Sequence, residues 1–182
     1  MFKYIPNCIT VFRIILVFVF MHFFNSGYDN HNIISGVVFI VAGISDVLDG
    51  YLARKFKLQS DFGRLMDPFA DKLLQITVAF CIASVEKSLM WVPVVLILKE
   101  LVMILGAARL LKKENIVVSA NKFGKISSTL YFLVFMIILF FPDINPQIKQ
   151  IMCASFIITS VLAFLVYMQN YIQIYKEKNK NN

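Results

Sequence analysis

The chain has 182 residues, of which 59% are hydrophobic, with a mean hydropathy of +0.73 and a formal net charge of +7. Apolar runs such as "ISSTLYFLVFMIILFF" exceed what a soluble core needs, so the composition excludes an ordinary water-soluble helical bundle and indicates an integral membrane protein. A transmembrane helix needs about 20 apolar residues. This length therefore supplies about six such helices and leaves no room for a separate soluble domain.

The hydrophobic segments, in chain order, predict six transmembrane helices. We expect them at 8–26, 33–56, 62–85, 88–112, 122–142 and 147–175. Turn-forming sequences separate them: "NSGYDNHN", "KLQSDFG", "VEKS", "KKENIVVSAN" and "PDINPQ". The predicted fold class is therefore all-α, an integral membrane bundle that forms a single domain over 1–182, with a flexible polar tail at 175–182.

The N-terminal residues "IPNCITVFR" precede most of the first predicted helix. They form an amphipathic segment, which we expect to lie along the membrane interface. Lys3 before an apolar stretch is also typical of a signal peptide, but "HFFNSGYDN" after it lacks a small-residue cleavage site. We therefore expect the first helix to be retained.

Basic residues gather at alternate helix ends, which predicts the orientation in the membrane. If both termini are cytoplasmic, the outer loops carry only Lys87 and Lys149. The cytoplasmic ends then carry Lys3, Arg13, Arg54, Lys55, Lys57, Arg64, Arg109, Lys112, Lys113, Lys122, Lys125, Lys176, Lys178 and Lys180. Such a face favours anionic lipid and phosphate-bearing substrates rather than nucleic acid.

Four aspartates interrupt the second and third hydrophobic segments. Asp46 and Asp49 lie toward the cytoplasmic end of the second predicted helix, and Asp67 and Asp71 lie in the opening turns of the third. Residues three, four or seven apart share one side of a helix, so each pair projects from one stripe. The two helices can therefore direct four carboxylates toward one point at the cytoplasmic face.

Clustered carboxylates repel one another and are costly at membrane depth, so they need cations, protonation or water. Mg²⁺ and Mn²⁺ prefer carboxylate and water oxygens, and Mg²⁺ is often shared with substrate phosphates. Two such ions about 4 Å apart can hold the attacking and leaving oxygens of a phosphoryl transfer. We therefore expect two Mg²⁺ or Mn²⁺ ions at this cluster.

Small residues accompany the acids at helical spacing. Gly36 and Gly43 are most simply helix-packing positions, whereas Gly50 and Gly63 flank the acids and let a ligand approach the backbone. Arg54, one turn beyond Gly50, can either bind a diphosphate through its planar guanidinium or serve as a charge that sets the topology.

These residues form one spaced pattern: Asp46-x2-Asp49-Gly50-x2-Ala53-Arg54-x8-Gly63-x3-Asp67-x3-Asp71. At every fixed position it resembles the signature of the CDP-alcohol phosphotransferase family. "IPNCITVFR" is similar to the N-terminal segment of that family, so the resemblance covers essentially the whole chain. It implies a six-helix membrane enzyme that transfers a substituted phosphate from a CDP-linked donor to an alcohol and releases CMP.

The resemblance also assigns roles to individual residues. It implies that Asp46, Asp49 and Asp67 are metal ligands and that Asp71 is both a ligand and the general base. The residues that it assigns to the cytidine diphosphate are Gly50, Ala53, Arg54 and Gly63. Members of the family are commonly homodimers, so a homodimer is expected here as well.

Within the family, the chain most resembles the small bacterial members that join CDP-diacylglycerol to glycerol 3-phosphate. "LKELVMILGAARLL" is similar to a segment of these members that usually reads Arg-Glu with a later Arg. "NKFGKISSTLYF" is similar to a Gly-Lys-x-Lys-Thr segment, but Ser127 replaces the second lysine. By this resemblance, the acceptor phosphate is assigned to Lys99, Arg109, Lys122 and Lys125, which are otherwise charges that set the topology.

Ser127 leaves other acceptors open, namely phosphatidylglycerol, serine, inositol or inositol phosphate. Outside the family, an intramembrane prenyltransferase also uses aspartate-rich helices with Mg²⁺, but it generally needs more helices than this chain supplies. A cation-binding transporter also gathers carboxylates at broken helices, but it does not need Gly50, Ala53 and Arg54. We therefore expect a metal-dependent phosphatidyltransferase of the cytoplasmic membrane, with its active site facing the cytoplasm and with CDP-diacylglycerol and glycerol 3-phosphate as substrates.

Overall fold

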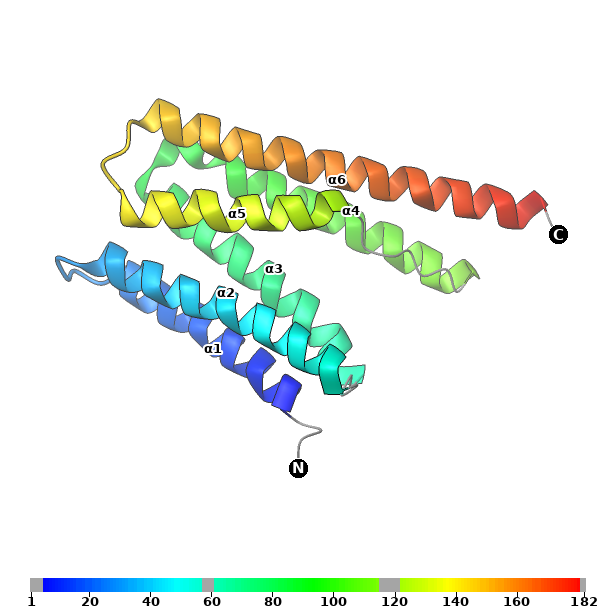
Figure 1. Cartoon of the computed structure of the whole chain (residues 1–182). Coiled ribbons are helices and arrows are strands. Elements are labelled where there is room, and N and C mark those ends of the chain that lie inside the picture. Colours follow the sequence, from blue (N-terminus) through cyan, green and yellow to red (C-terminus); the bar gives the residue numbers. More distant parts are fainter. Residues whose placement is uncertain (1–4, 57–60, 115–121, 181–182) are drawn as a thin grey trace. The chain divides into compact units, whose positions relative to one another are not determined.

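The structure, a computed structural model, describes residues 5–56, 61–114 and 122–180, and within these ranges it contains helices and no strand (Figure 1). Some side chains in these helices lie outside the description: those at 5–7, 52–54, 56, 61–65, 104–114, 122–123 and 170–180. The prediction of an all-α fold is confirmed for the described residues.

Each of the six predicted segments corresponds to one long helix. The elements are α1 (Ile5–Phe24), α2 (His31–Phe56), α3 (Asp61–Val85), the 3-10 helix η2 (Lys87–Leu89), α4 (Trp91–Glu114), α5 (Lys122–Phe140) and α6 (Pro146–Lys180). The first turns of α1 include "IPNCITVFR", which we expected to form a segment of its own. α6 stays helical to Lys180, past residue 175, where we expected the tail to begin.

Three of the described helices contain stretches long and apolar enough to cross a membrane. These stretches are His31–Tyr51 in α2, Met66–Val85 in α3 and Pro146–Gln169 in α6. Shorter apolar stretches occur at Cys8–Phe24 and Gly124–Phe140. Two of the three longest stretches therefore contain the aspartate pairs, near the helix ends that the segment 57–60 joins.

The chain divides into two compact units. The first unit contains Met1–Lys87 and Phe135–Ile144, and therefore α1, α2, α3 and the end of α5. The second unit contains Ser88–Val134 and Asn145–Asn182, and therefore α4, most of α5 and α6. All four aspartates of the predicted site belong to the first unit.

In the first unit, α1 packs against both α2 and α3 (Figure 1). Its buried face follows steps of three and four residues: Thr10, Arg13, Val17, Phe20 and Phe24. Such steps keep side chains on one side of a helix. The apolar part of this face holds α1 against its neighbours, and its polar part, Thr10 and Arg13, meets the acidic ends of α2 and α3.

A glycine of α2 allows close packing with the end of α5. A Cβ atom built on Gly36 would lie 2.7 Å from a ring atom of Phe140, which is closer than side-chain carbons approach one another. The missing side chain therefore lets the Phe140 ring pack directly on the α2 backbone. The packing role predicted for Gly36 is confirmed.

In the second unit, α4 packs against α6. Lys99 of α4 forms an ion pair with Glu100, at 2.8 Å between Nζ and Oε1, and donates a hydrogen bond to Ser160 Oγ of α6 at 3.0 Å. Glu100 is only 8% exposed. Because burying an unpaired charge is costly, these contacts explain how the apolar first part of α4 carries two adjacent charges.

Candidate active site

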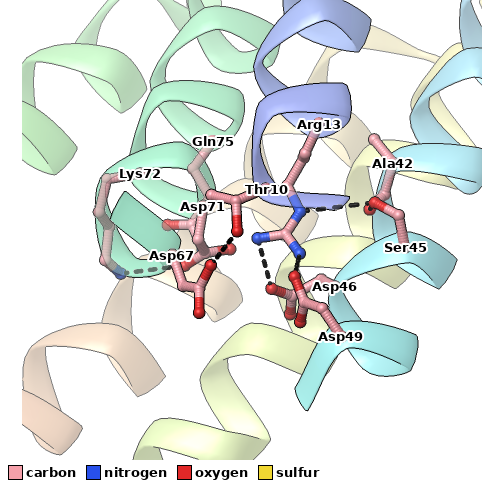
Figure 2. Close-up of polar contacts among 10 residues, drawn as sticks. All are labelled: Thr10, Arg13, Ala42, Ser45, Asp46, Asp49, Asp67, Asp71, Lys72 and Gln75. Atoms are coloured by element: carbon pink, nitrogen blue, oxygen red, sulfur yellow. Dashed lines mark hydrogen bonds and ion pairs between the residues drawn. The ribbon is translucent and has the colours of Figure 1, made fainter. Parts of the chain in front are cut away.

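The four aspartates lie on the two helices that pack against α1. Asp46 and Asp49 project from the last turns of α2, and Asp67 and Asp71 project from the first turns of α3. Figure 2 shows these side chains on either side of the first turns of α1, which carry Thr10 and Arg13. Both pairs are contacted by α1: Arg13 contacts Asp46 and Asp49, and Thr10, one turn away, contacts Asp67.

Arg13 lies between the two aspartates of α2 and contacts both (Figure 2). Its Nη2 donates a hydrogen bond to Asp49 Oδ2, and its Nε donates a long one, at 3.5 Å, to Ser45 Oγ. Its Nη1 lies 2.8 Å from Asp46 Oδ1 in an ion pair without hydrogen-bond alignment. Arg13 is 1% exposed, and therefore its charge depends on these partners rather than on water.

The two aspartates of α3 have different surroundings. Thr10 of α1, fully buried, donates a hydrogen bond to Asp67 Oδ1. Asp71 is contacted from its own helix, by the Gln75 amide at 3.3 and 3.4 Å and by Lys72 Nζ at 3.7 Å. These distances are long for hydrogen bonds, and the Asp71 side chain is 26% exposed. Asp71 is therefore partly accessible, and the contacts described for it come from its own helix, whereas Asp67 is held from α1.

Two residues of the site, Thr10 and Arg13, were not identified from the sequence. Arg13 was interpreted as one of the basic residues that set the topology, and Thr10 had no assigned role. The signal that could have found them is their spacing, since both fall on the apolar stripe that continues through Val17, Phe20 and Phe24. A charged residue on the buried stripe of an apolar helix requires a partner of opposite charge, and the four aspartates supply it.

The carboxylate oxygens of this cluster are hard donors of the kind that Mg²⁺ and Mn²⁺ bind. Among the described side chains of the cluster, four carboxylates face two cations, Arg13 and Lys72, which leaves two negative charges in excess. In the described part of the chain, no three acidic, histidine or cysteine side chains converge as metal ligands. Asp46, Asp49 and Asp67 instead each direct one oxygen to α1. The donor set fits a divalent cation, provided that these carboxylates turn toward it.

The residues predicted to hold the cytidine diphosphate lie on the same two helices. Gly50 follows Asp49 in α2 and is partly exposed. Ala53 and Arg54 lie in the next turn of α2 and Gly63 in the first turn of α3, but their side chains lie outside the described residues. These three residues therefore lie at the ends of α2 and α3 that carry the aspartates.

The basic residues predicted to bind the acceptor phosphate belong to the second unit. Lys125 is exposed at the beginning of α5, whereas Lys99 is held by Glu100 and Ser160. The side chains of Arg109 in α4 and Lys122 in α5 lie outside the described residues. Of the two described side chains in this group, Lys99 is therefore already paired with a carboxylate, that of Glu100.

Comparison with known proteins gives consistent matches over this chain. The family model described as CDP-alcohol phosphatidyltransferase matches residues 3–168. The CDP-diacylglycerol--glycerol-3-phosphate 3-phosphatidyltransferase of Wigglesworthia glossinidia brevipalpis is 28% identical over 183 residues, which cover 97% of this chain and 98% of that protein. The protein of the same name from Bacillus subtilis is 32% identical over 136 residues, or 68% and 70% of the two chains. That of Rickettsia typhi is 30% identical over 131 residues, or 70% and 71%.

Proposed function

The chain belongs to the CDP-alcohol phosphatidyltransferase family, and we propose that it transfers the phosphatidyl group of CDP-diacylglycerol to glycerol 3-phosphate. The products are phosphatidylglycerophosphate and CMP. The names of its relatives support this choice of donor and acceptor. The observation that carries the proposal is the presence of all four motif aspartates on α2 and α3, around the first turns of α1.

In this proposal the aspartates Asp46, Asp49, Asp67 and Asp71 hold two Mg²⁺ or Mn²⁺ ions. When bound, such ions neutralise the diphosphate and stabilise the charge on the attacking and leaving oxygens. The position of the four aspartates around the first turns of α1 supports this proposal. To bind the ions, Asp46, Asp49 and Asp67 turn from Arg13 and Thr10.

Asp71 is the general base of the proposed reaction. It accepts the proton of the glycerol 3-phosphate hydroxyl while that oxygen bonds to the phosphorus carrying diacylglycerol. The bond from this phosphorus to the oxygen shared with the cytidine phosphate breaks, and CMP leaves. The partial exposure of Asp71 supports this role, because an acceptor hydroxyl must reach the carboxylate.

The donor and acceptor sites follow from the motif positions. We assign the cytidine diphosphate to Gly50, Ala53, Arg54 and Gly63, since glycine lets a ligand approach the backbone and arginine binds phosphates with its planar fork. Glycerol 3-phosphate arrives as a dianion and needs cations of its own. The residues that we assign to it are Arg109, Lys122 and Lys125, with Lys99 as the weakest candidate because it already pairs with Glu100.

All six long helices cross the cytoplasmic membrane in this proposal, and the aspartates face the cytoplasm. The three long apolar stretches and the two shorter ones support membrane insertion, and the asymmetry of the basic residues supports the orientation. We further propose that the first turns of α1 lie at the cytoplasmic interface and that the protein is a homodimer, as is common in the family.

An acceptor panel tests the proposed function. Purified protein is supplied with CDP-diacylglycerol and Mg²⁺, and CMP release is measured with glycerol 3-phosphate, phosphatidylglycerol, serine, inositol or inositol phosphate. We expect rapid release with glycerol 3-phosphate alone. Release with only another acceptor would change the substrate, and no release with any acceptor would overturn the transferase assignment. In that case, cation flux into proteoliposomes would test the transporter alternative.

A further inference from the structure

We propose that Arg13 is a positioning residue and a built-in counter-ion of the acidic cluster: it holds Asp46 and Asp49 until a divalent cation binds, and the cation then displaces its guanidinium from Asp46. The inference rests on the proposed function, because it concerns the same carboxylates. It adds a residue of α1 that lies outside the aspartate pattern of α2 and α3.

The burial of Arg13 makes the counter-ion role necessary. The side chain is 1% exposed, and arginine remains charged at any ordinary pH. A buried charge without a partner is strongly destabilising. Asp46 and Asp49 are the charged groups that the structure places against the guanidinium, so they stabilise Arg13 as much as Arg13 stabilises them.

The guanidinium holds its two aspartates unequally. Asp49 is buried and accepts a hydrogen bond from Nη2. The Asp46 side chain is 43% exposed, and its contact with Nη1 at 2.8 Å is an ion pair without hydrogen-bond alignment. A contact with a half-exposed, poorly aligned carboxylate contributes less stability than an aligned bond to a buried one. Asp46 is therefore the carboxylate that Arg13 releases first.

A divalent cation competes with Arg13 for the same carboxylates. Both need the oxygens of Asp46, and the positive charge of the ion repels the guanidinium across a short distance. Binding at one position weakens binding at the other by the same factor, because coupling between two sites is reciprocal. Arg13 thus stabilises the cluster without metal and lowers its affinity for the metal.

Thr10 differs from Arg13 in a way that isolates the effect of charge. It holds Asp67 through a neutral hydroxyl and carries no charge that repels a cation. Both residues lie on the same buried face of α1, one turn apart. The counter-ion role is therefore specific to Arg13 among the two α1 residues that contact the acids.

The test measures Mn²⁺ binding to the purified full chain, by titration with detection of free Mn²⁺, in wild type, Arg13→Gln and Arg13→Lys. Lys87→Gln is the matched control, since it removes one positive charge from an exposed site at the other end of α3. Arg13→Gln should bind Mn²⁺ at least about 10-fold more tightly than wild type, because a like charge is removed. Its melting temperature without metal should fall, and Mg²⁺ should raise it by more than in wild type. Lys87→Gln should match wild type.

Unchanged or weaker Mn²⁺ binding by Arg13→Gln would overturn the inference. If Arg13 only held Asp46 and Asp49 in place, its replacement would leave them disordered, and the protein would bind Mn²⁺ no better than wild type. If Arg13→Gln does not fold, Arg13→Lys decides: it keeps the charge but cannot span both carboxylates, and a smaller gain in affinity is expected. No gain in the lysine variant would then contradict the proposal. CMP release by wild type is measured in parallel, so loss of the proposed function and loss of the counter-ion role give different results.

Discussion

Each of the two units places a basic side chain with little exposure against an acidic one, but the two clusters differ in charge balance and in access. In the second unit, Lys99 pairs with Glu100, and Ser160 accepts a further hydrogen bond. In the first unit, Arg13 faces two aspartates, with two more on α3, and one of its partners, Asp46, is 43% exposed. Among the described side chains, the first cluster has negative charge in excess and one half-exposed carboxylate, whereas the charges of Lys99 and Glu100 balance.

In an apolar chain, the balance of charge distinguishes a structural charge pair from a reactive cluster. A pair with equal and opposite charges needs no added cation, and the hydrogen bond from Lys99 to Ser160 also links α4 to α6. A cluster with surplus carboxylates is complete only when cations or protons are added. We therefore expect perturbations of the first cluster to affect activity and perturbations of the second to affect stability.

Removal of divalent cations is expected to have the largest effect. Excess chelator should abolish CMP release, because the surplus carboxylates of the first cluster lose the ions that neutralise the diphosphate. Mg²⁺ or Mn²⁺ should restore it, whereas Ca²⁺, with longer and looser coordination, should restore little. Helicity measured by circular dichroism should persist in chelator, because the Lys99 to Glu100 pair needs no metal. Full activity in chelator would rule out the metal-dependent mechanism.

Asp71→Asn is expected to have the next largest effect. The substitution keeps the shape of the side chain but removes the proton acceptor, and loss of a general base typically slows a reaction by about 10²- to 10⁴-fold. The measurement is kcat for CMP release at saturating Mg²⁺, with the melting temperature as a control for folding. If added Mg²⁺ alone returned kcat to the wild-type value, Asp71 would be a ligand and not the base.

Glu100→Gln should lower stability more than activity. It leaves the largely buried Lys99 charge without the carboxylate of Glu100, and breaking a fully buried ion pair costs about 3 to 5 kcal/mol, which is an upper bound for this pair. Lys99→Met combined with Glu100→Leu removes both charges and should be much closer to wild type in denaturant titration. A large loss of kcat in the folded double variant would mean that the second cluster takes part in the reaction and that the contrast between the clusters is wrong.

Arg109→Ala is expected to have the smallest effect and to test the acceptor site. A charge-assisted hydrogen bond contributes about 1.5 to 3 kcal/mol, so KM for glycerol 3-phosphate should rise by about 10- to 100-fold. Affinity for CDP-diacylglycerol should stay close to that of wild type. Lys99→Met provides the comparison: a larger rise in KM there than in Arg109→Ala would move the acceptor phosphate to Lys99.

The helices of this protein could be predicted from the sequence because long apolar runs are a property of contiguous residues. The predicted segment 33–56 corresponds to α2 at His31–Phe56, and 62–85 corresponds to α3 at Asp61–Val85. The aspartate pairs could be predicted for the same reason, since their spacing of three and four residues already implies one helix face. Burial against a particular neighbour, as for Gly36 under the ring of Phe140, was predicted only as packing without its partner.

The sequence by itself therefore determined the helices, their apolar character and the identity of the acidic cluster, because each depends on residues close together in the chain. Only the tertiary structure decided which charges meet. From the sequence, Arg13 was interpreted as a basic residue that sets the topology and Lys99 as a candidate for the acceptor phosphate. In the structure, Arg13 pairs with Asp49, 36 residues away, and Lys99 bonds to Ser160, 61 residues away. Contacts of that separation depend on how the helices pack. The packing places α1 against both acid-bearing helices, and this makes Arg13 part of the site.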